Sequence, residues 1–375
     1  MVDRLLLVTS SYPDAGEGEA AAGSFVADFA AALSSHCRVG VVCPGRTSSS
    51  TQQEPTLTVH RFAVPRLPLS QLSAGRLTDW PVIASTLRAG RIAVAHACER
   101  ECPEHILALW ALPCGEWARR SGVPYAIWAL GSDIWTLRRL PLVRQVLRHV
   151  LRRATHRFAD GLQLAEDVER LGGRPCAFLA SSRRLPRREK TARAADGPLK
   201  LAFLGRWHAN KGIDLLLDAL GQLDEATWAR IESVRIAGGG PLETAVRQGC
   251  VTLRAGGRPV HDEGYLDREA AADLLTWADR LLLPSRIESI PVVYSDALQA
   301  GCPLVAMPVG DLPRLLREDR SGWLAEAVTA SAFAAAIRGS VASQQPLPTF
   351  APGALNRFSV EANAALLLER LASQP

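Results

Sequence analysis

The stretch LKLAFLGRWHANKGIDLLLDAL, residues 199–220, joins three sequence patterns that together indicate the fold. Residues 199–205 form a short, mainly apolar run, which is typical of a strand inside a sheet. Glycine and basic residues follow, and from residue 212 onward leucines recur at helical spacing. The stretch therefore predicts a strand, a loop and a helix, which is the beginning of a βαβ unit with a parallel sheet.

The same alternation of strand and helix patterns extends in both directions from this stretch. Before it, we expect strands at residues 4–10, 37–45, 91–97 and 124–133, and helices at 23–36, 104–112, 115–122 and 140–158. After it, the alternation continues through 233–241, 241–250, 270–279, 280–286, 290–301 and 303–310. A last helix is expected at 359–373, with Ser359 as its N-cap. The chain is therefore predicted to be an α/β protein of two doubly wound units in tandem.

A polar segment rich in Arg, Pro and Ala, residues 181–198, lies between the two units. It offers almost nothing to bury, which is typical of a linker between domains. We therefore predict a first Rossmann-like domain at 1–188 and a second at 196–352. Residues 353–375 are predicted to form a C-terminal helix that could cross back to the first domain.

The composition is that of an ordinary globular protein. Of 375 residues, 47% are hydrophobic and 22% are charged, with a net charge of +5. That excess alone does not indicate nucleic-acid binding, although it suits a phosphate-bearing partner or an anionic membrane surface. The eight cysteines contain no C-x-x-C pair, and no apolar run has the form of a signal peptide or of a spanning helix. We expect a cytoplasmic protein with reduced thiols, at most peripheral at the inner face of the membrane.

The loop at residues 205–212 is the first candidate binding segment. In doubly wound sheets ligands bind beyond the carboxyl ends of the strands, and this loop directly follows a predicted strand. It brings Gly205, Arg206 and Lys211 together, and two cations on a flexible loop suit an oxyanion-rich ligand such as a diphosphate. A Walker loop is excluded, because the lysine precedes a glycine that is followed by Ile. Two solvated surface charges are the alternative.

A second candidate segment, RIESIPVVYSDALQAG (286–301), contains two acids around the predicted start of a helix. Pro291 suits the first turn of a helix, so Glu288 would precede the helix and Asp296 would lie about 7 to 8 Å along its axis from Pro291. This arrangement matches an extended ligand whose anionic middle lies at the helix N-terminus better than it matches a facing glycosidase pair. The alternative is an acid that stabilises the helix dipole together with a surface Asp.

The first half contains weaker candidates. His96, at the end of a predicted strand, could line a ligand cleft, and Gly131 with Asp133 follows another predicted strand, where Asp133 could bind hydroxyls, act as a base or cap the next helix. A zinc site in HACERECPEH (96–105) is disfavoured, because the H-x-C-x3-C-x2-H spacing is not a usual zinc pattern. The basic helix at 140–157 could contact a membrane surface, or could simply expose a solvated arginine face.

Taken together, these segments resemble the retaining glycosyltransferases of family four, which have the GT-B fold of two facing Rossmann-like domains with a cleft between them. The resemblance is strong in the second half and looser in the first. In the second half it rests on five motifs in order: GRWHANKGIDLLLDAL, IAGGGP, EGYLDREAAADLLTWADRLLLPSRIES, ESIPVVYSDALQAGCPLVAMPVGDLPRLL and SGWLAE. In the first half it rests on VTSSYPDAGEGEAAAGSFVADFAAAL and WALGSDIW.

The resemblance implies a role for each candidate residue. Arg206 and Lys211 would bind the diphosphate of a nucleotide-sugar donor and neutralise the leaving group, while Glu288 would contact donor-sugar hydroxyls. Asp296 would bind the ribose. The other implied donor-binding residues are Gly205, Ser289, Ile290, Pro291, Val292, Gly264 and Tyr265, and the residues on the acceptor side are Gly23, His96, Gly131 and Asp133. The acceptor would be a glycan, a lipid-linked molecule or a small molecule.

Two positions depart from the family pattern. The second acid of the E-x7-E motif, usually glutamate, is Asp296, whose arm is one methylene shorter, and Leu130 stands where the family often has histidine. The resemblance implies a metal-independent hexosyltransferase of polysaccharide biosynthesis with no cofactor and no nucleic-acid partner. In it, the departing phosphate helps to deprotonate the acceptor, and electrostatic stabilisation of that phosphate is the main catalytic task. A sugar-nucleotide epimerase, a non-catalytic nucleotide-sugar-binding subunit and a metal-binding regulatory module remain the alternatives.

Overall fold

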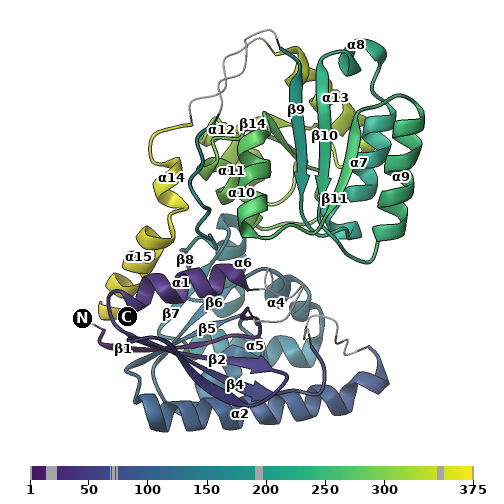
Figure 1. Ribbon diagram of the computed structural model, residues 1–375. Helices are drawn as coiled ribbons and strands as arrows, with labels where there is room; N and C mark the ends of the chain where they lie inside the picture. Colours follow the sequence, from purple (N-terminus) through teal and green to yellow (C-terminus); the bar gives the residue numbers. More distant parts are fainter. Residues whose placement is uncertain are drawn as a thin grey trace. The chain divides into compact units, whose positions relative to one another are not determined.

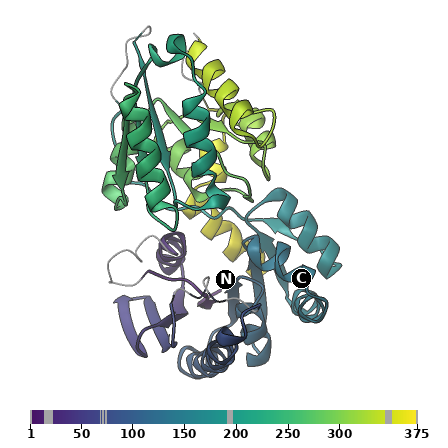
Figure 2. The ribbon, with the colours of Figure 1, turned by 90° about the vertical axis from the view of Figure 1, so that its right-hand side faces the viewer.

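The computed structural model describes residues 2–13, 23–67, 69, 72, 75–190, 197–343 and 350–373. The chain forms two compact units, each built around a mainly parallel sheet (Figures 1 and 2). Unit 1 comprises Met1–Arg183 together with Ser359–Pro375, and unit 2 comprises Arg184–Phe358. Unit 1 is therefore assembled from two separate parts of the chain. Among the described residues, every helix is too short or too polar to cross a bilayer.

The sheet of unit 1 has eight strands in the order β3-β4-β2-β1-β5-β6-β7-β8. Every pairing in it is parallel except that of β3 with β4. The strands are β1 (Arg4–Val8), β2 (Arg38–Gly45), β3 (Ser49–Glu54), β4 (Leu57–Ala63), β5 (His105–Leu109), β6 (Tyr125–Ala129), β7 (His156–Ala159) and β8 (Ala177–Phe178). The helices are α1 (Ser24–Ser34), α2 (Trp80–Glu101), α3 (Cys114–Ser121), α4 (Ser132–Trp135), α5 (Pro141–Arg153), α6 (Leu162–Gly172) and α15 (Val360–Ala372), with 3-10 turns η2 (Leu77–Asp79) and η3 (Leu137–Arg139).

Two hydrophobic clusters cover the two faces of this sheet. Successive residues of β1 point to opposite faces, so Leu5 and Leu7 belong to one cluster and Leu6 and Val8 to the other. The first cluster includes side chains from α1 and α15, and the second includes side chains from α2, α3, α5 and α6. Because both faces are buried, the central strands are apolar without alternation, as expected of a parallel sheet.

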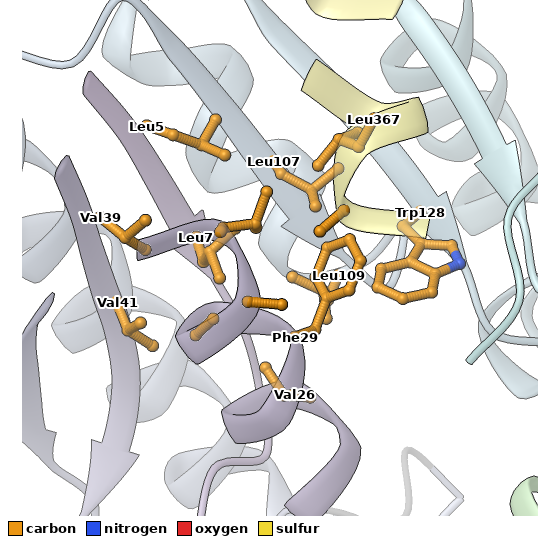
Figure 3. Packing of buried hydrophobic residues seen from close by; sticks show 14 of the residues in the cluster. Leu5, Leu7, Val26, Phe29, Val39, Val41, Leu107, Leu109, Trp128 and Leu367 are labelled. Carbon is orange, nitrogen blue, oxygen red and sulfur yellow. The ribbon is translucent and has the colours of Figure 1, made fainter. Parts of the chain in front are cut away.

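Helix α15 completes the core of unit 1. Its Leu367 lies in the same cluster as Phe29 of α1 and Trp128 of β6 (Figure 3). The rings of Phe29 and Trp128 lie 4.8 Å apart between centroids, and the Trp128 indole N–H donates to the Leu179 carbonyl. The Ser359 side chain accepts a hydrogen bond from the Ala362 N–H, which confirms the predicted N-cap. This helix therefore belongs structurally to a unit that begins more than three hundred residues earlier.

Unit 2 contains a six-stranded, fully parallel sheet in the order β11-β10-β9-β12-β13-β14. Its strands are β9 (Leu199–Leu204), β10 (Ile231–Ala237), β11 (Val260–Gly264), β12 (Arg280–Leu283), β13 (Leu304–Ala306) and β14 (Gly322–Leu324). Its helices are α7 (Ile213–Gly221), α8 (Glu225–Trp228), α9 (Glu243–Ala255), α10 (Arg268–Trp277), α11 (Val292–Gln299), α12 (Leu312–Glu318), α13 (Ala330–Ala342) and α14 (Ala354–Arg357), with the 3-10 turn η4 (Ala209–Lys211). The strand order is that of a Rossmann fold. From β9 the chain adds β10 and β11 on one side and then β12, β13 and β14 on the other, so the strand order reverses between β9 and β12, although all the strands are parallel.

Three predicted elements are wrong. Residues 91–97, predicted as a strand, lie in α2, where the buried residues Gly90, Val94 and Ala97 recur at helical spacing. Residues 104–112, predicted as a helix, contain β5, because an apolar run buried on both faces of a sheet has no periodicity that separates it from a helix. The basic helix ends at Arg153 rather than at residue 158, and Arg157 lies in β7.

Candidate functional site

The predicted donor-binding residues of unit 2 follow β9 and β12, the strands on either side of the reversal in strand order. Arg206 and Lys211 lie in the loop from β9 to α7, and Glu288 lies in the loop from β12 to α11. Ligands of doubly wound sheets bind beyond the carboxyl ends of the strands at this reversal. The topology therefore brings the two candidate segments, residues 205–212 and 286–301, to one edge of one sheet.

Lys211 and Glu288 make direct contact. The Lys211 ammonium donates a hydrogen bond to Glu288 Oε1, and the Ser285 hydroxyl donates to the same oxygen over 2.9 Å. The Glu288 side chain is 11% exposed, whereas that of Lys211 is 34% exposed. A carboxylate oriented by two donors and a partly exposed ammonium thus lie side by side, and both can reach a ligand.

A second ion pair joins the same two loops. The Arg286 guanidinium donates to both carboxylate oxygens of Asp214, over 2.7 and 2.6 Å, and also to the Ala209 carbonyl over 2.6 Å. The hydrogen bonds from Arg286 hold the pKa of the Asp214 carboxyl below its usual value. Bidentate pairing fixes geometry as well as charge, so this pair orients the segment that presents Lys211.

Close backbone approach fixes the loops further. Gly212 has φ +66°, and a Cβ added there would lie 1.8 Å from the Pro284 carbonyl oxygen. Gly310 has φ +52°, and a Cβ on it would lie 2.3 Å from the Glu288 carbonyl oxygen. Glycine is required at both positions on two grounds, conformation and space. The loops after β9, β12 and β13 are consequently packed backbone against backbone.

The N-terminus of α11 adds an anion-friendly surface to this site. Pro291 is the N-cap residue and has no side-chain hydrogen bond with which to cap the helix, and the first turn contains no acid. The hydroxyl oxygen of Ser289, two residues earlier, is buried without a hydrogen-bond partner among the described residues. Unpaired helix N–H groups and a positive dipole end favour an anion here, next to Lys211. Ile290 is buried, with 6% exposure, while Val292 begins the helix.

Helix α11 is held from its buried side. The Tyr294 hydroxyl donates to Asp319 over 2.8 Å and lies 2.9 Å from the Ser321 hydroxyl. Burial raises the pKa of Tyr294 above its usual value, so it stays a neutral donor. Asp296, on the same helix, is completely buried. Its carboxylate therefore lies in the packed interior of unit 2 rather than on an open surface.

The remaining predicted donor residues surround this centre. Arg206 is exposed, and its guanidinium has no hydrogen bond or ion pair with any part of the chain that the structure describes. The preceding residue, Gly205, packs closely against Gly238, because a Cβ on Gly238 would lie 1.9 Å from the Gly205 carbonyl oxygen. Gly264, with φ +71°, ends β11 and accepts a hydrogen bond from the Gly238 N–H. Tyr265 follows it and is 51% exposed, so its ring is available to a planar ligand.

In unit 1, three of the four predicted acceptor-side residues end strands or begin helices. Gly23 has φ +79° and is the N-cap of α1, and Gly131 is the N-cap of α4. The Asp133 carboxylate accepts hydrogen bonds from the Ala111 N–H over 2.6 Å and the Leu130 N–H over 3.2 Å. Burial raises the pKa of Asp133 to about 6 even though the backbone donors oppose it. Asp133 thus joins the ends of β5 and β6, and it would titrate near neutral pH.

The prediction for His96 is wrong in its structural premise. His96 lies within α2, exposed to solvent, and not at the end of a strand. The other side chains of the disfavoured zinc motif are spread over α2, the residue after it and the first residue of β5. No group of three or more His, Cys, Asp or Glu side chains with metal-binding geometry occurs in the described ranges.

Arg157 is also misplaced in the prediction of an exposed basic helix. It is 7% exposed in β7 and donates to the carbonyls of Pro175, Leu151 and Ala154. These hydrogen bonds satisfy its guanidinium inside unit 1. The exposed arginines of this region are therefore those of α5 and η3, and Arg157 adds nothing to a surface charge.

Several residues of the site were not predicted from the sequence. Ser285 and Gly310 lie against Glu288, and Arg286 pairs with Asp214 beside the loop that contains Lys211. Arg286 was the most detectable, because it directly follows the apolar strand and lies two positions before Glu288. The pairing of Arg286 with Asp214, 72 positions away, depends on tertiary structure alone.

Comparison with known proteins gives a family match over most of unit 2. Residues 198–342 match the family model described as glycosyl transferases group 1. Over 189 residues the chain is 31% identical to a D-inositol 3-phosphate glycosyltransferase of Xylanimonas cellulosilytica; the match covers 48% of this chain and 44% of that protein. The chain thus spans less than half the length of this curated relative.

Solved structures match over nearly the whole chain. Sucrose-phosphate synthase from Thermosynechococcus elongatus superimposes with a TM-score of 0.73 at 17% identity, covering 98% of both chains. Anabaena Alr3699/HepE, in complex with UDP and glucose, gives a TM-score of 0.68 at 16% identity, covering 99% of this chain and 100% of that chain. At these identities the likeness concerns the fold. Residues 198–342 therefore match the glycosyl transferases group 1, within a chain that has the GT-B fold.

Proposed function

We propose that this protein is a retaining glycosyltransferase that moves a sugar from a nucleotide-sugar donor to an acceptor hydroxyl. The observation on which the proposal rests is the contact of Lys211 with Glu288, three residues before the N-cap of α11, with Arg206 in the same loop as Lys211. Two cations and a helix N-terminus suit a diphosphate, and a neighbouring carboxylate suits sugar hydroxyls. The glycosyltransferase names of the relatives support the same conclusion.

In this proposal the donor extends along unit 2. The diphosphate binds Arg206, Lys211 and the backbone from Ser289 to Val292, with Gly205 allowing close approach. The Glu288 carboxylate accepts hydrogen bonds from the donor sugar. Asp296, which is completely buried without the donor, binds the ribose once donor binding exposes its carboxylate. The base lies by Gly264 and Tyr265. The complexes of Alr3699/HepE with UDP and with UDP-glucose support a uridine nucleotide as the first donor to test.

The transfer itself needs no covalent enzyme intermediate. The bond from the sugar C1 to the diphosphate oxygen breaks while a bond from C1 to the acceptor oxygen forms on the same face. The electron pair of the broken bond leaves with the diphosphate, so negative charge develops there, and the departing phosphate oxygen then takes up the acceptor proton. Arg206 and Lys211 stabilise that charge, which is the largest catalytic contribution expected of such a site. Since protein cations neutralise the leaving group, we expect the activity to persist in the presence of a chelator.

The proposal allows three classes of acceptor. A glycan, a lipid-linked molecule or a small molecule would bind to unit 1, where Gly23 and Gly131 are the N-caps of α1 and α4 and Asp133 lies in the first turn of α4. We propose a role in polysaccharide biosynthesis in the cytoplasm, where the free cysteines remain reduced. The reaction products identify the acceptor class, because a transferase product contains both the sugar and the acceptor.

The test compares Arg206→Ala and Lys211→Ala with Arg230→Ala. Arg230 is an exposed arginine of the same unit, but it precedes β10 and so lies at the opposite, amino end of the sheet. A thermal-shift screen of UDP, GDP and ADP, each with its sugars, first identifies the donor, because a ligand at 100 times its Kd stabilises by about 2.7 kcal/mol. Transfer or donor hydrolysis is then measured by product analysis.

We expect both site variants to lose at least 100-fold in turnover, since removal of one oxyanion-stabilising donor costs about that much. They should keep the circular dichroism spectrum of the parent, and Arg230→Ala should retain parental activity. Nuclear magnetic resonance of the product gives the anomeric configuration, and inversion would refute the retaining mechanism. Wild-type turnover in both site variants, or isomerised donor without any acceptor, would refute the transferase assignment.

A further inference from the structure

A pocket of about 430 Å³ in unit 1 is lined almost entirely by arginines. It is lined by residues of η3, α5 and α6, and α5 packs against both η3 and α6. The lining residues are Arg138, Arg139, Arg144, Arg148, Asp167, Arg170 and Leu171. The volume falls within the range of small-ligand pockets. Five guanidinium groups and one carboxylate give the lining a formal charge of +4.

The single carboxylate of the pocket is already fully engaged. Asp167 Oδ1 lies 3.2 Å from the Arg138 guanidinium and 2.7 Å from that of Arg170, and Oδ2 accepts the Trp135 indole N–H over 2.7 Å. Its side chain is 8% exposed. Asp167 therefore orients two arginines at the base of the pocket and leaves no negative charge for the others.

The other three arginines form no ion pair with an acid of the described residues. Arg139, Arg144 and Arg148 are exposed, and in the described parts of the chain none of their side chains forms an ion pair or hydrogen bond. Arg144 and Arg148 are four positions apart on α5, and like charges at this spacing destabilise a helix. The first turn of α5 contains no acid. Repulsion between these arginines therefore destabilises this part of the fold, and a bound anion would offset that repulsion.

We propose that this pocket binds a phosphate or diphosphate group of a ligand distinct from the donor nucleotide. Guanidinium groups donate two parallel hydrogen bonds to phosphate oxygens, and several of them converging on one volume match a multiply charged oxyanion. A lone carboxylate ligand would leave most of the charge unpaired. The group could belong to a soluble phosphorylated molecule or to a phosphorylated lipid, since both present the same chemistry to the arginines.

The proposal stands apart from the transferase assignment. The pocket belongs to unit 1, whereas Arg206 and Lys211 belong to unit 2. A protein with no transferase activity could still bind phosphate here. Conversely, an active transferase could lack this site, so the two conclusions can fail separately.

The test uses the full chain with Arg206→Ala and Lys211→Ala, so that pyrophosphate has no access to the proposed donor cations. Into this background we introduce the pocket pair Arg144→Gln with Arg148→Gln, or the control pair Arg152→Gln with Arg153→Gln. Both pairs remove two positive charges from exposed positions of α5, but the control residues do not line the pocket. Calorimetric titration with sodium pyrophosphate at low ionic strength, where surface electrostatics are least screened, measures the Kd.

We expect the pocket pair to raise the Kd for pyrophosphate at least tenfold and the control pair to raise it less than threefold, because charge-assisted hydrogen bonds depend on position. Equal weakening by the two pairs would refute the site, as it would reflect net charge alone. Absence of pyrophosphate binding in the starting protein would refute it too. The same comparison in the unsubstituted chain shows whether binding persists with the donor cations present.

Two further titrations distinguish the sources of the phosphate. One uses glucose 6-phosphate, and the other uses phosphatidylcholine vesicles with and without phosphatidic acid in a sedimentation assay. Selective loss of glucose 6-phosphate binding in the pocket pair assigns a soluble ligand, and selective loss of phosphatidic acid binding assigns a lipid headgroup. Retention of both in the pocket pair would contradict the proposal.

Discussion

The Lys211 ammonium donates its hydrogen bond to Glu288, a residue 77 positions further along the chain. The contact joins the loops after β9 and β12 at the reversal of strand order. It also pairs the cation proposed for the diphosphate with the carboxylate proposed for the donor sugar. Binding of a donor would therefore compete with the ion pair that Lys211 and Glu288 already form.

Glu288→Gln should separate binding from turnover. Glutamine keeps the size and one acceptor but removes the charge paired with Lys211, so the ammonium becomes more available to a diphosphate. We expect calorimetric binding of the nucleoside diphosphate to be unchanged or tighter. Turnover should fall about 10- to 100-fold, since a hydrogen bond to a charged group is worth about 1.5–3 kcal/mol. A parallel loss of binding and turnover would instead assign Glu288 to positioning Lys211.

Gly212→Ala should disrupt unit 2, whereas Gly221→Ala should not. A Cβ at Gly212 meets the Pro284 carbonyl oxygen at a positive φ, while one at Gly221, at the end of α7, meets nothing within 4 Å. We expect a loss of about 2 kcal/mol or more in the free energy of unfolding for Gly212→Ala, measured in urea by circular dichroism. Gly221→Ala should be neutral or stabilise by up to about 1 kcal/mol. Similar behaviour of the two variants would show that the close approach to Pro284 is not structurally important.

Asp296→Glu should have opposite effects on binding and stability. The longer arm restores the glutamate of the family pattern, so we expect tighter binding of the nucleoside diphosphate. The extra methylene enters a completely buried site, which costs about 1–3 kcal/mol of folding stability. Calorimetry and urea unfolding measure the two effects separately. Weaker binding in a folded variant would show that the shorter acid is the fitting one here.

Asp133 should make unit 1 lose stability as the pH rises. Burial raises the pKa of Asp133 from 3.8 to about 6, so the folded state favours the protonated form. Its stabilising contribution is therefore complete below pH 3.8 and is lost as the pH rises through 6, by about 3 kcal/mol in all. The free energy of unfolding of the parent relative to Asp133→Asn, measured from pH 3.5 to 7, should fall by roughly that amount. A difference that is independent of pH would contradict the raised pKa.

The sequence predicted the fold of unit 2 well because its strands and helices have distinct periods and its loops begin where apolar runs stop. Arg206, Lys211 and Glu288 could be singled out for the same reason, as charges placed immediately after strands. Unit 1 was harder to predict. The alanine-rich stretch around His96 fits a helix face that only the buried contacts of Gly90, Val94 and Ala97 define.

What the sequence could not provide were the partners. The ion pair of Asp214 with Arg286 and the approach of Gly310 to Glu288 join segments that are distant in the chain, and no local pattern encodes them. The burial of Asp133 and Arg157 could not be predicted from the sequence either. Both residues are charged, and both are satisfied inside the protein by backbone groups: Asp133 accepts from the Ala111 N–H, and Arg157 donates to the Pro175 carbonyl. The sequence therefore places at the surface two residues that the folded chain buries.

Because α15 packs in unit 1, part of the core of unit 1 is missing until the end of synthesis on the ribosome. The apolar side of α1, with Val26, Phe29 and Leu33, lacks part of its cover until residues 360–372 have left the ribosome. Synthesis of the intervening unit 2 takes roughly 10 to 35 seconds at the usual rates. Unit 2 is continuous in the chain and is synthesised entirely before α15. Unit 1 begins first in the gene, yet its core cannot be completed until unit 2 has been made.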